Sequence, residues 1–182
     1  TYMITININN EIGRLRSVIL GAASDFGGTP KEVDCYDPKS KENVLNGTFP
    51  TEQDLSDELN KFREVLEKYN VKVFRPEIIQ NLNQIFIRDI AFVIDDKIIV
   101  PNIISNRRNE INGINYLLKD IDSKKILRLG VDSMVEGGDV ILSDNKIFIG
   151  YSKENDFIKY KVSRTNERAI EEIRSFFPNK EV

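Results

Sequence analysis

The sequence predicts an α/β fold made of repeated strand-strand-helix modules that surround a central pocket. Two stretches carry this prediction, IRDIAFVIDDKIIVP from Ile87 to Pro101 and GGDVILSDNKIFIG from Gly137 to Gly150. Each has an acid near its start, Asp89 or Asp139, and continues as an apolar strand, a polar turn and a second apolar strand. A helix is expected after each hairpin, so the chain repeats itself with a period of about fifty residues. A period of that length suggests blades arranged about a centre.

The segment before the repeat predicts a strand, a polar excursion, a helix and a second strand. LRSVILG (Leu15 to Gly21) is a short apolar strand, and the polar residues that follow it up to Pro50 are expected at the surface. A helix is expected to open at Thr51, because Asp54 three residues on forms a weak capping box with it. VKVFRP (Val71 to Pro76) is the second strand. Apolar residues at helical spacing predict one buried stripe on the helix: Leu55, Leu59, Phe62, Leu66 and Tyr69.

The two hairpins of the repeat turn at pairs of polar residues, Asp95–Asp96 and Asp144–Asn145. The helices expected after them run from about Arg107 to Lys119 and from about Asn166 to Phe177. The run from Tyr151 to Lys161 lengthens the second copy, either as a gate over the pocket or as an inserted loop. The residues expected to face inward are Ile111, Ile114, Leu117 and Leu118 in the first helix, and Ala169, Ile170, Ile173 and Phe177 in the second.

Composition excludes several classes of protein. The 26 basic and 29 acidic residues give a net charge of −3, so no basic surface for nucleic acid is expected. The sequence has no apolar run of membrane-spanning length and no signal-peptide pattern at its start, which predicts a cytoplasmic protein without a membrane partner. A single cysteine, Cys35, and no histidine exclude a disulfide framework and the usual zinc spacings. We therefore expect one domain over residues 1–182 with a small polar or zwitterionic partner.

A central pocket would collect the acids that begin the modules and the arginines that precede the helices, Arg107 and Arg164. Carboxylates bind a cationic group that has several hydrogen-bond donors, and arginines bind a carboxylate through two parallel hydrogen bonds. Arginine and its derivatives carry both kinds of group. The pattern therefore favours an arginine-like ligand.

Five motifs in order resemble the guanidino-group-modifying enzymes of the pentein fold, which is an α/β propeller. The motifs are RLRSVILG, NQIFIRD, NRRNE, EGGD and SRTN, and together they extend over nearly the whole chain. The family includes arginine deiminases, dimethylarginine dimethylaminohydrolases and glycine amidinotransferases. EGGD and SRTN are more similar to the hydrolase branch. The resemblance implies a hydrolase that acts on the guanidino group of arginine or a methylated or related derivative, with no metal or organic cofactor.

The resemblance also implies roles for individual residues. Asp89 of FIRD would grip the substrate guanidinium, and Glu136 of EGGD would contact both the guanidinium and the catalytic histidine of the family. These two acids are the catalytic candidates. Gly137 and Gly138 would let the backbone approach the central axis closely. The other substrate-binding candidates are Phe86, beside the guanidinium, and Asn83, Arg107 and Arg164, at the amino-acid end.

The chain departs from the family at the two groups that carry out the bond chemistry. In the family a cysteine thiolate attacks the guanidinium carbon, and a histidine assists the water that resolves the covalent intermediate. This sequence has no histidine, and Cys35 lies in an early loop, whereas the family nucleophile lies near the C-terminus. We therefore expect the N-terminal portion of a longer enzyme, about three modules of five, without turnover by itself. Open edges of an incomplete ring predict a homo-oligomer or pairing with the missing C-terminal half.

Three functions remain open at this point: a hydrolase of arginine derivatives, an amidinotransferase, and a non-catalytic arginine-binding or regulatory fragment. Each candidate residue also has a structural alternative. Asp89 fits a strand-start acid satisfied by backbone amides, Glu136 fits a surface turn, and Arg164 fits a surface arginine beside a helix cap. For Asp139 a structural role is favoured, in which it holds the turn or pairs with a nearby base.

Overall fold

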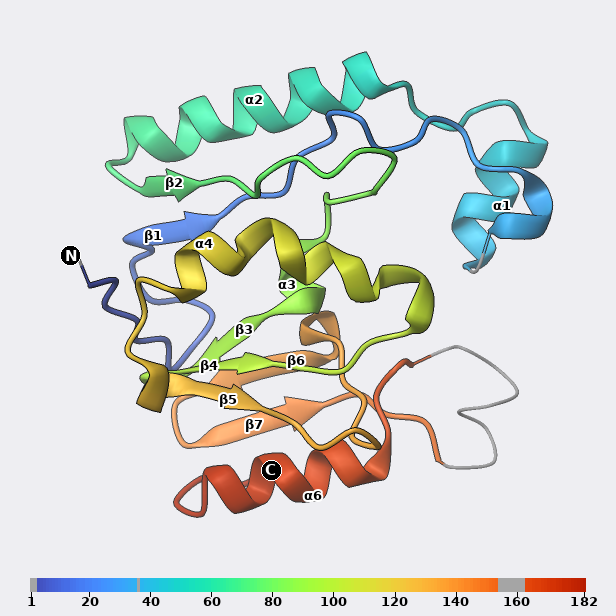
Figure 1. Ribbon diagram of the computed structural model, residues 1–182. Coiled ribbons are helices and arrows are strands. Elements are labelled where there is room, and N and C mark those ends of the chain that lie inside the picture. The colour runs from blue at the N-terminus through green and yellow to red at the C-terminus, as the bar shows by residue number, and fades with distance from the viewer. Residues whose placement is uncertain (1–2, 36, 154–162) are drawn as a thin grey trace. The chain divides into compact units, whose positions relative to one another are not determined.

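The computed structural model describes residues 3–35, 37–153 and 163–182. These residues form two compact units (Figure 1): unit 1 contains Thr1–Arg14 and Arg88–Val182, and unit 2 contains Leu15–Ile87. Most of the run from Tyr151 to Lys161 lies outside the described residues, so the choice between a gate and an inserted loop stays open. The sheets of the described residues have two, three and two strands, and the expected α/β class is confirmed. Within the same residues, no helix is both long and apolar enough to cross a membrane.

Unit 2 is built on two short parallel strands, β1 (Ser17–Ile19) and β2 (Lys72–Phe74), at the predicted positions. Helix α2 (Glu52–Lys68) connects them and lies alongside β2 (Figure 1). The helix begins at its N-cap Thr51, whose hydroxyl oxygen accepts a hydrogen bond from the N–H of Asp54 at 3.2 Å, as the capping box predicts.

The predicted buried stripe on α2 is wrong for this chain. No residue of α2 is buried: Phe62 is 52% exposed, and Tyr69, which follows the helix, is 70% exposed. The periodicity is present, but the sheet of unit 2 has only two strands of three residues each. A sheet of this size is too small to cover a stripe that runs along five turns of helix.

The polar segment before α2 contains two helices that the sequence analysis did not predict. They are η1 (Glu32–Asp34) and α1 (Pro38–Leu45), and neither buries a residue, so the expected surface position is confirmed for these two helices. The start of the segment differs, because Ala22, Ala23 and Phe26 are buried. Helix α1 begins at Asp37, whose Oδ1 accepts a hydrogen bond from the N–H of Ser40 at 2.8 Å. The helix was not predicted because its sequence has no apolar periodicity. Its start depends on a cap and on a proline in the first turn.

The first copy of the repeat begins with a one-turn helix that carries Asp89 and continues as the predicted hairpin. The hairpin turns at Asp95, which has a φ of 50°, a left-handed conformation that aspartate tolerates. The helix expected from Arg107 to Lys119 begins earlier, at Ser105, and most of it is 3-10 helix. An unpredicted strand then pairs in parallel with the second hairpin strand. The elements in order are α3 (Ile87–Ile90), β3 (Phe92–Ile94), β4 (Lys97–Val100), η2 (Ser105–Ile114), α4 (Asn115–Leu118), η3 (Ser123–Lys125) and β5 (Ile126–Arg128).

The second copy has the same order of helical turn, hairpin and helix. Its helical turn carries Asp139, and its hairpin turns at Asp144, which has a φ of 49°. The last helix begins at Asn166, whose Oδ1 accepts hydrogen bonds from the N–H groups of Ala169 and Met134, both at 3.1 Å. The predicted repeat of elements is therefore confirmed. The elements are η4 (Gly137–Asp139), β6 (Val140–Ser143), β7 (Lys146–Ile149) and α6 (Glu167–Phe176).

The two copies are joined at their hairpin turns. Ile8 of the N-terminal segment forms two backbone hydrogen bonds with Asp95, and Asn10 forms a bridge with Ser143. Lys180, which follows α6, places its Nζ 2.9 Å from Oδ1 of Asp95. The chain ends of unit 1 thus hold the two turns beside each other.

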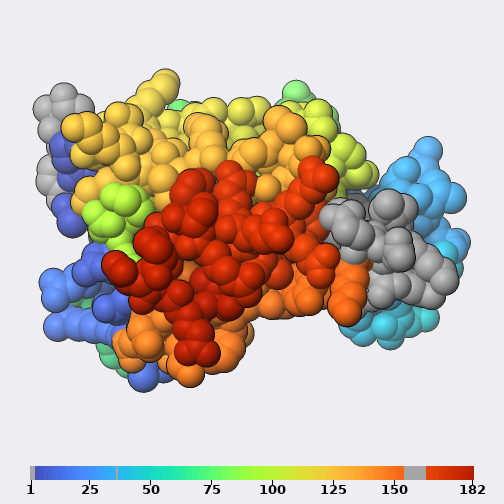
Figure 2. All heavy atoms as spheres, turned by 90° about the horizontal axis from the view of Figure 1, so that it is seen from below, coloured from blue at the N-terminus to red at the C-terminus, as the bar shows by residue number. Residues whose placement is uncertain are grey.

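The core of unit 1 forms between the two hairpins and α6. Helix α6 lies next to β7 in Figure 1, and Figure 2 shows its outer face in red at the surface. Its inner face is buried as predicted, while in the preceding helix Ile111 is only half-buried. The core residues are Phe92, Ile94, Ile99, Leu129, Val135, Val140, Leu142, Ile147, Ala169, Ile173 and Phe177.

Replacement of Ile173 by alanine tests this core. The side chain is fully buried, so Ile173→Ala is expected to lower the free energy of unfolding by about 2–5 kcal/mol, through lost burial and a residual cavity. The matched control is Ile141→Ala on β6, where the side chain is 54% exposed and a change below about 0.5 kcal/mol is expected. Urea unfolding followed by circular dichroism measures both. Equal losses for the two variants would contradict the assignment of the core.

Candidate functional site

Asp89 lies on α3, directly before the first hairpin, and its carboxylate joins the two copies of the repeat. Oδ1 accepts a hydrogen bond from the N–H of Gly138 at 3.0 Å, and Oδ2 accepts one from Nη1 of Arg107 at 2.7 Å. Two donors from different parts of unit 1 therefore fix its position. A strand-start acid that only accepts hydrogen bonds from backbone amides would not make the contact with Arg107.

The EGGD segment approaches Asp89 closely because it contains two glycines. A Cβ on Gly137 would lie 1.9 Å from the carbonyl oxygen of Arg88, and a Cβ on Gly138 would lie 2.6 Å from Oδ1 of Asp89. Neither position has room for a side chain. The backbone of EGGD thus approaches the Arg88–Asp89 turn closely, while the predicted approach to a central axis stays a prediction.

Arg107 is buried among carboxylates. Its Nε and Nη2 donate to the two oxygens of Glu110, both at 2.8 Å, and Nη1 also lies 3.6 Å from Oε2 of Glu136. The side chain of Arg107 is 4% exposed. Burial acts to lower its pKa, but hydrogen bonds to Glu110 and Asp89 outweigh it and raise the pKa above the ordinary value, so the guanidinium stays charged. In this arrangement Arg107 orients the acids around it.

Glu136 is the most perturbed acid of the group. Its Oε2 lies 3.0 Å from Nη2 of Arg164, while Oε1 is buried and has no hydrogen-bond partner. Burial raises the pKa of Glu136 to about 7, against the opposing charges of Arg164 and Arg107. The negative charge of Asp89 acts in the same direction as burial. With a pKa of about 7, the carboxyl group of Glu136 changes its protonation near neutral pH.

Carboxylates outnumber guanidinium groups in this cluster, which we call the acid cluster: Asp89, Glu110 and Glu136 face Arg107 and Arg164. Full ionisation leaves one negative charge without a cationic partner inside the cluster. Burial also raises the pKa of Glu110, with Asp89 adding to the effect. A proton or an added cation relieves this excess of buried negative charge.

The sequence analysis missed two residues, one that supports the acid cluster and one that belongs to it. Arg88 donates from Nε to the carbonyl of Gly137 at 3.0 Å and pairs through both terminal nitrogens with Glu11, at 3.1 and 2.8 Å. Glu110 is the other missed residue. Its signal was present, because it is the acid of NRRNE and lies three residues after Arg107, a spacing that places both side chains on one helix face.

Asp139 has structural contacts, but its side chain holds the SRTN segment and not the turn that was predicted. Its Oδ2 accepts hydrogen bonds from Oγ1 of Thr165 at 2.7 Å and from Oγ of Ser163 at 3.2 Å. Thr165 in turn accepts a hydrogen bond from the N–H of Glu136 at 3.4 Å. Asp139 therefore anchors the SRTN segment next to Glu136.

The structure brings four of the six predicted site residues together, and the other two belong to unit 2. Asn83 accepts a hydrogen bond from the N–H of Ile85 at 3.1 Å, and Phe86 is 58% exposed. Cys35 also belongs to unit 2, half-exposed, with its Sγ 3.4 Å from the carbonyl of Lys31. Over residues 3–35, 37–153 and 163–182, no three His, Cys, Asp or Glu side chains form a group that could hold a metal ion.

Comparison with known proteins identifies the fold. No family model matches the chain. It is 30% identical over 104 residues to the uncharacterized protein YkgA of Bacillus subtilis (strain 168). The matched residues cover 56% of this chain and 35% of YkgA. The structure is similar to inosamine-phosphate amidinotransferase StrB1 from Streptomyces griseus, with a TM-score of 0.65, 14% identity and coverage of 94% of this chain and 59% of StrB1. It is equally similar to a mutant dimethylarginine dimethylaminohydrolase from Pseudomonas aeruginosa complexed with citrulline, with a TM-score of 0.64 and 16% identity. This match covers 90% of this chain and 57% of the hydrolase.

These similarities confirm the mixed α/β pentein fold that the five motifs predicted. The sheets of the described residues are small and none is closed, so the propeller arrangement of the modules stays a prediction. Both solved proteins are guanidino-modifying enzymes of the pentein superfamily. At this level of identity the likeness establishes the fold alone. The chain spans about a third of the length of the curated relative and less than two thirds of each solved chain.

The raised pKa of Glu136 predicts a specific pH dependence of stability. A carboxyl group whose pKa is higher in the folded state binds its proton more tightly when folded, so its contribution is greatest below the ordinary value of 4.5 and is lost as the pH rises through about 7. Glu136→Gln mimics the protonated form. The variant is expected to gain stability relative to the parent chain between pH 5 and pH 8, by on the order of 2–3 kcal/mol.

Urea unfolding of both proteins across this pH range measures the difference. The control is Glu181→Gln, an exposed glutamate paired with the exposed Lys146, for which the difference should not change with pH. A difference for Glu136→Gln that is independent of pH would show that Glu136 is already ionised throughout the range.

Proposed function

Since the chain has the pentein fold of guanidino-modifying enzymes, we propose that it provides the guanidinium-binding part of a hydrolase that acts on arginine or a methylated or related derivative. In this proposal the chain is the N-terminal portion of the enzyme, with about three modules of a five-module propeller. The cysteine and histidine of the reaction belong to the remainder of the parent protein. The ligand is a small guanidino compound, without a metal or organic cofactor.

The observation that carries the proposal is the excess of buried carboxylate in the acid cluster. Glu136 has a buried oxygen, Oε1, without a hydrogen-bond partner, and its pKa is raised to about 7. A guanidinium group supplies a positive charge and several N–H donors in one plane, which matches two carboxylates better than a compact ammonium does. Its arrival would satisfy the oxygen and balance the charge together.

In the proposed complex the residues act at the two ends of the ligand. Asp89 and Glu136 contact the guanidinium, and Phe86 packs beside it. Arg164, which is about a quarter exposed, and Asn83 bind the amino-acid end. Arg107 is also proposed there, although its present hydrogen bonds go to Asp89 and Glu110. A ligand carboxylate would have to displace one of these acids from Arg107.

The reaction of the parent enzyme would follow from this placement. A cysteine thiolate adds to the guanidinium carbon, ammonia or an alkylamine leaves, and water releases the ureido product. Glu136 would hold the catalytic histidine in its charged form. The two carboxylates would fix the orientation of the guanidinium plane for the attack of the thiolate.

An amidinotransferase is the second candidate function. The structure is as similar to the amidinotransferase StrB1 as to the dimethylarginine hydrolase, and a guanidinium site is common to both reactions. The two differ in whether an amine or water resolves the covalent intermediate. A third candidate is a fragment that binds arginine without catalysis, since the sequence has no histidine.

Selective binding of arginine over citrulline tests the guanidinium site. Citrulline has nearly the same shape but carries a neutral ureido group in place of the guanidinium. We expect the 182-residue chain to bind arginine at least about tenfold more tightly than citrulline, and Glu136→Gln to weaken arginine binding by about tenfold to a hundredfold. Isothermal titration calorimetry measures each constant, with Glu181→Gln as the control. Equal binding of both ligands, or no effect of Glu136→Gln, would contradict the proposal.

The 182-residue chain is also expected to show no turnover. Incubation with arginine and its methylated forms, followed by assays for ammonia and ureido products, should give no more product than a blank. Intact-mass measurement of the gene product then tests the proposed longer parent, which should have a mass well above 20.9 kDa. Product formation by the short chain would mean that its own residues supply a nucleophile and a base.

A further inference from the structure

One ion pair of unit 1 is connected to the acid cluster through the backbone of EGGD. Arg88 stands directly before Asp89, and its two terminal nitrogens donate to both carboxylate oxygens of Glu11, at 3.1 and 2.8 Å. Oε1 of Glu11 also accepts a hydrogen bond from the N–H of Leu142 at 3.2 Å. The hydrogen bonds from Arg88 lower the pKa of Glu11 against the effect of burial, so the pair is charged at neutral pH. A carboxylate of the N-terminal segment thus holds a side chain of the first repeat copy and the backbone of the second.

Arg88 uses its other donors on the backbone that follows Glu136. Its Nε donates to the carbonyl of Gly137 at 3.0 Å, and its Nη2 donates to the carbonyl of Val140 at 2.7 Å. The carbonyl of Gly137 also accepts the N–H of Val140 within the helical turn η4. A planar guanidinium can make these contacts and pair with a carboxylate at the same time, because its donors are arranged as a fork.

The peptide unit between Gly137 and Gly138 links these contacts to Asp89. Its carbonyl accepts a hydrogen bond from Arg88, and its N–H donates to Oδ1 of Asp89 at 3.0 Å. Two consecutive residues of FIRD therefore hold opposite edges of one trans peptide plane. Glycines at both ends provide no side chain that favours one orientation of this plane, so its hydrogen bonds set the orientation. A rotated plane would lose its hydrogen bond to Asp89 and turn the carbonyl oxygen toward that carboxylate.

We propose that Glu11 is a positioning residue of the guanidinium site, which acts through Arg88 on the peptide that follows Glu136 and binds Asp89. Since this role rests on the proposed function, Glu11 fixes Arg88 and does not itself touch the ligand. The side chains of Glu11 and Arg88 are 34% and 51% exposed, and an ion pair at such a surface contributes little to stability. Loss of the pair should therefore change ligand binding more than it changes the unfolding of the chain.

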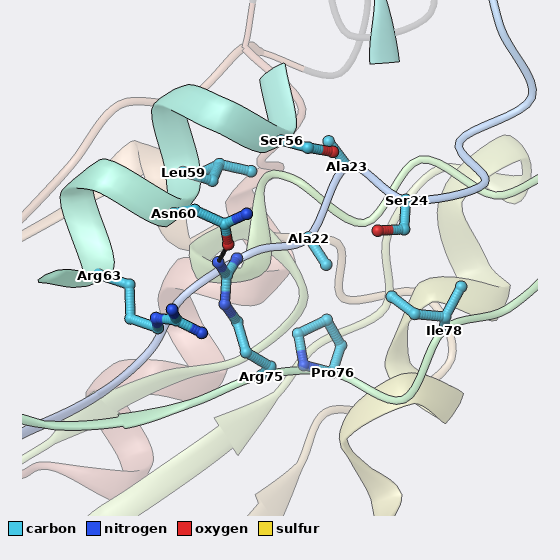
Figure 3. Close-up of a pocket in the computed structure, with 10 residues that line it drawn as sticks. All are labelled: Ala22, Ala23, Ser24, Ser56, Leu59, Asn60, Arg63, Arg75, Pro76 and Ile78. Carbon is cyan, nitrogen blue, oxygen red and sulfur yellow. Dashed lines mark hydrogen bonds between the residues drawn. The ribbon is translucent and has the colours of Figure 1, made fainter. Parts of the chain in front are cut away.

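A pocket in unit 2 is a separate place where a small ligand could bind. It has a volume of about 230 Å³ and lies between α2 and the segments that follow β1 and β2 (Figure 3). Its lining residues belong to unit 2, so arginine bound there would not depend on Glu11. Ser56→Leu fills part of this pocket and serves as a control, for which unchanged arginine binding is expected.

Hydrogen exchange at the amide of Gly138 tests the positioning without any ligand. The variants are Glu11→Gln, Arg88→Gln and the two combined. Glycine that is isotopically labelled at its carbonyl carbon and amide nitrogen selects the amides of Gly28 and Gly138 by NMR, because each follows another glycine in the sequence. Each variant is expected to raise the exchange rate of Gly138 by at least about tenfold and to leave that of Gly28 unchanged.

Calorimetric titration with arginine and with citrulline gives the second readout. Each single variant should weaken arginine binding by about tenfold and lower the preference for arginine, whereas a loss of folded protein alone would weaken both ligands alike. The double variant should bind no more weakly than Arg88→Gln, because Glu11 acts through Arg88. The matched control is Asp132→Asn, which breaks an exposed pair of unit 1 between Asp132 and Arg168, at 2.9 Å.

The outcomes keep the positioning role apart from the proposed function. Unchanged exchange of Gly138 in both single variants, or an unchanged preference for arginine, overturns the role of Glu11. Additive losses in the double variant overturn the route through Arg88. If the unsubstituted chain shows no preference for arginine, the proposed function fails, while faster exchange of Gly138 would still support the hold of Glu11 on this peptide.

Discussion

The hydrogen bonds from the buried guanidinium of Arg107 to Asp89 and Glu110 are the interaction on which the site depends. Without that charge, three carboxylates would face one another in a buried space, which costs several kcal/mol for each unpaired ion. With it, two of the acids are satisfied and the third, Glu136, keeps a buried oxygen without a partner. The glycines of EGGD complete the constraint, because only they allow the second copy of the repeat to reach Asp89. The acid cluster is therefore left with one more carboxylate than its two arginines balance.

Local sequence signals were sufficient for most elements of unit 1. The hairpins were predicted because apolar strands flank turn residues that tolerate a positive φ, Asp95 and Asp144, and the last helix because Asn166 caps an apolar period. Strand β5 (Ile126–Arg128) was not predicted, since its pairing with β4 is non-local in sequence. The apolar residues of α2 recur at helical spacing as predicted, but no residue of the helix is buried. Burial depends on what the rest of the chain places against the helix.

The acids and arginines of the site could be named from motif order, but their contacts could not. Glu110 stands in a quoted motif, yet its bidentate pairing with Arg107 depends on rotamers and burial that a sequence does not specify. Arg88 is similar: beside Asp89 it reads as an ordinary surface charge, whereas the fold brings Glu11 to it from the N-terminal segment. The raised pKa of Glu136 is also a property of the assembled cluster, because burial and the neighbouring charges are long-range in sequence.

Proton release on arginine binding tests the central claim most directly, namely that the acid cluster is completed by a guanidinium. A cation next to Glu136 lowers its pKa from about 7, so binding at pH 7 should release up to about half a proton per arginine. Calorimetric titration in two buffers of different ionisation enthalpy gives this number, and Glu136→Gln should abolish it. Proton release of the predicted size by the unsubstituted chain, and none by Glu136→Gln, would support a guanidinium next to Glu136. Arginine binding without any proton release would contradict it, because the guanidinium would then not contact the acid that lacks a partner.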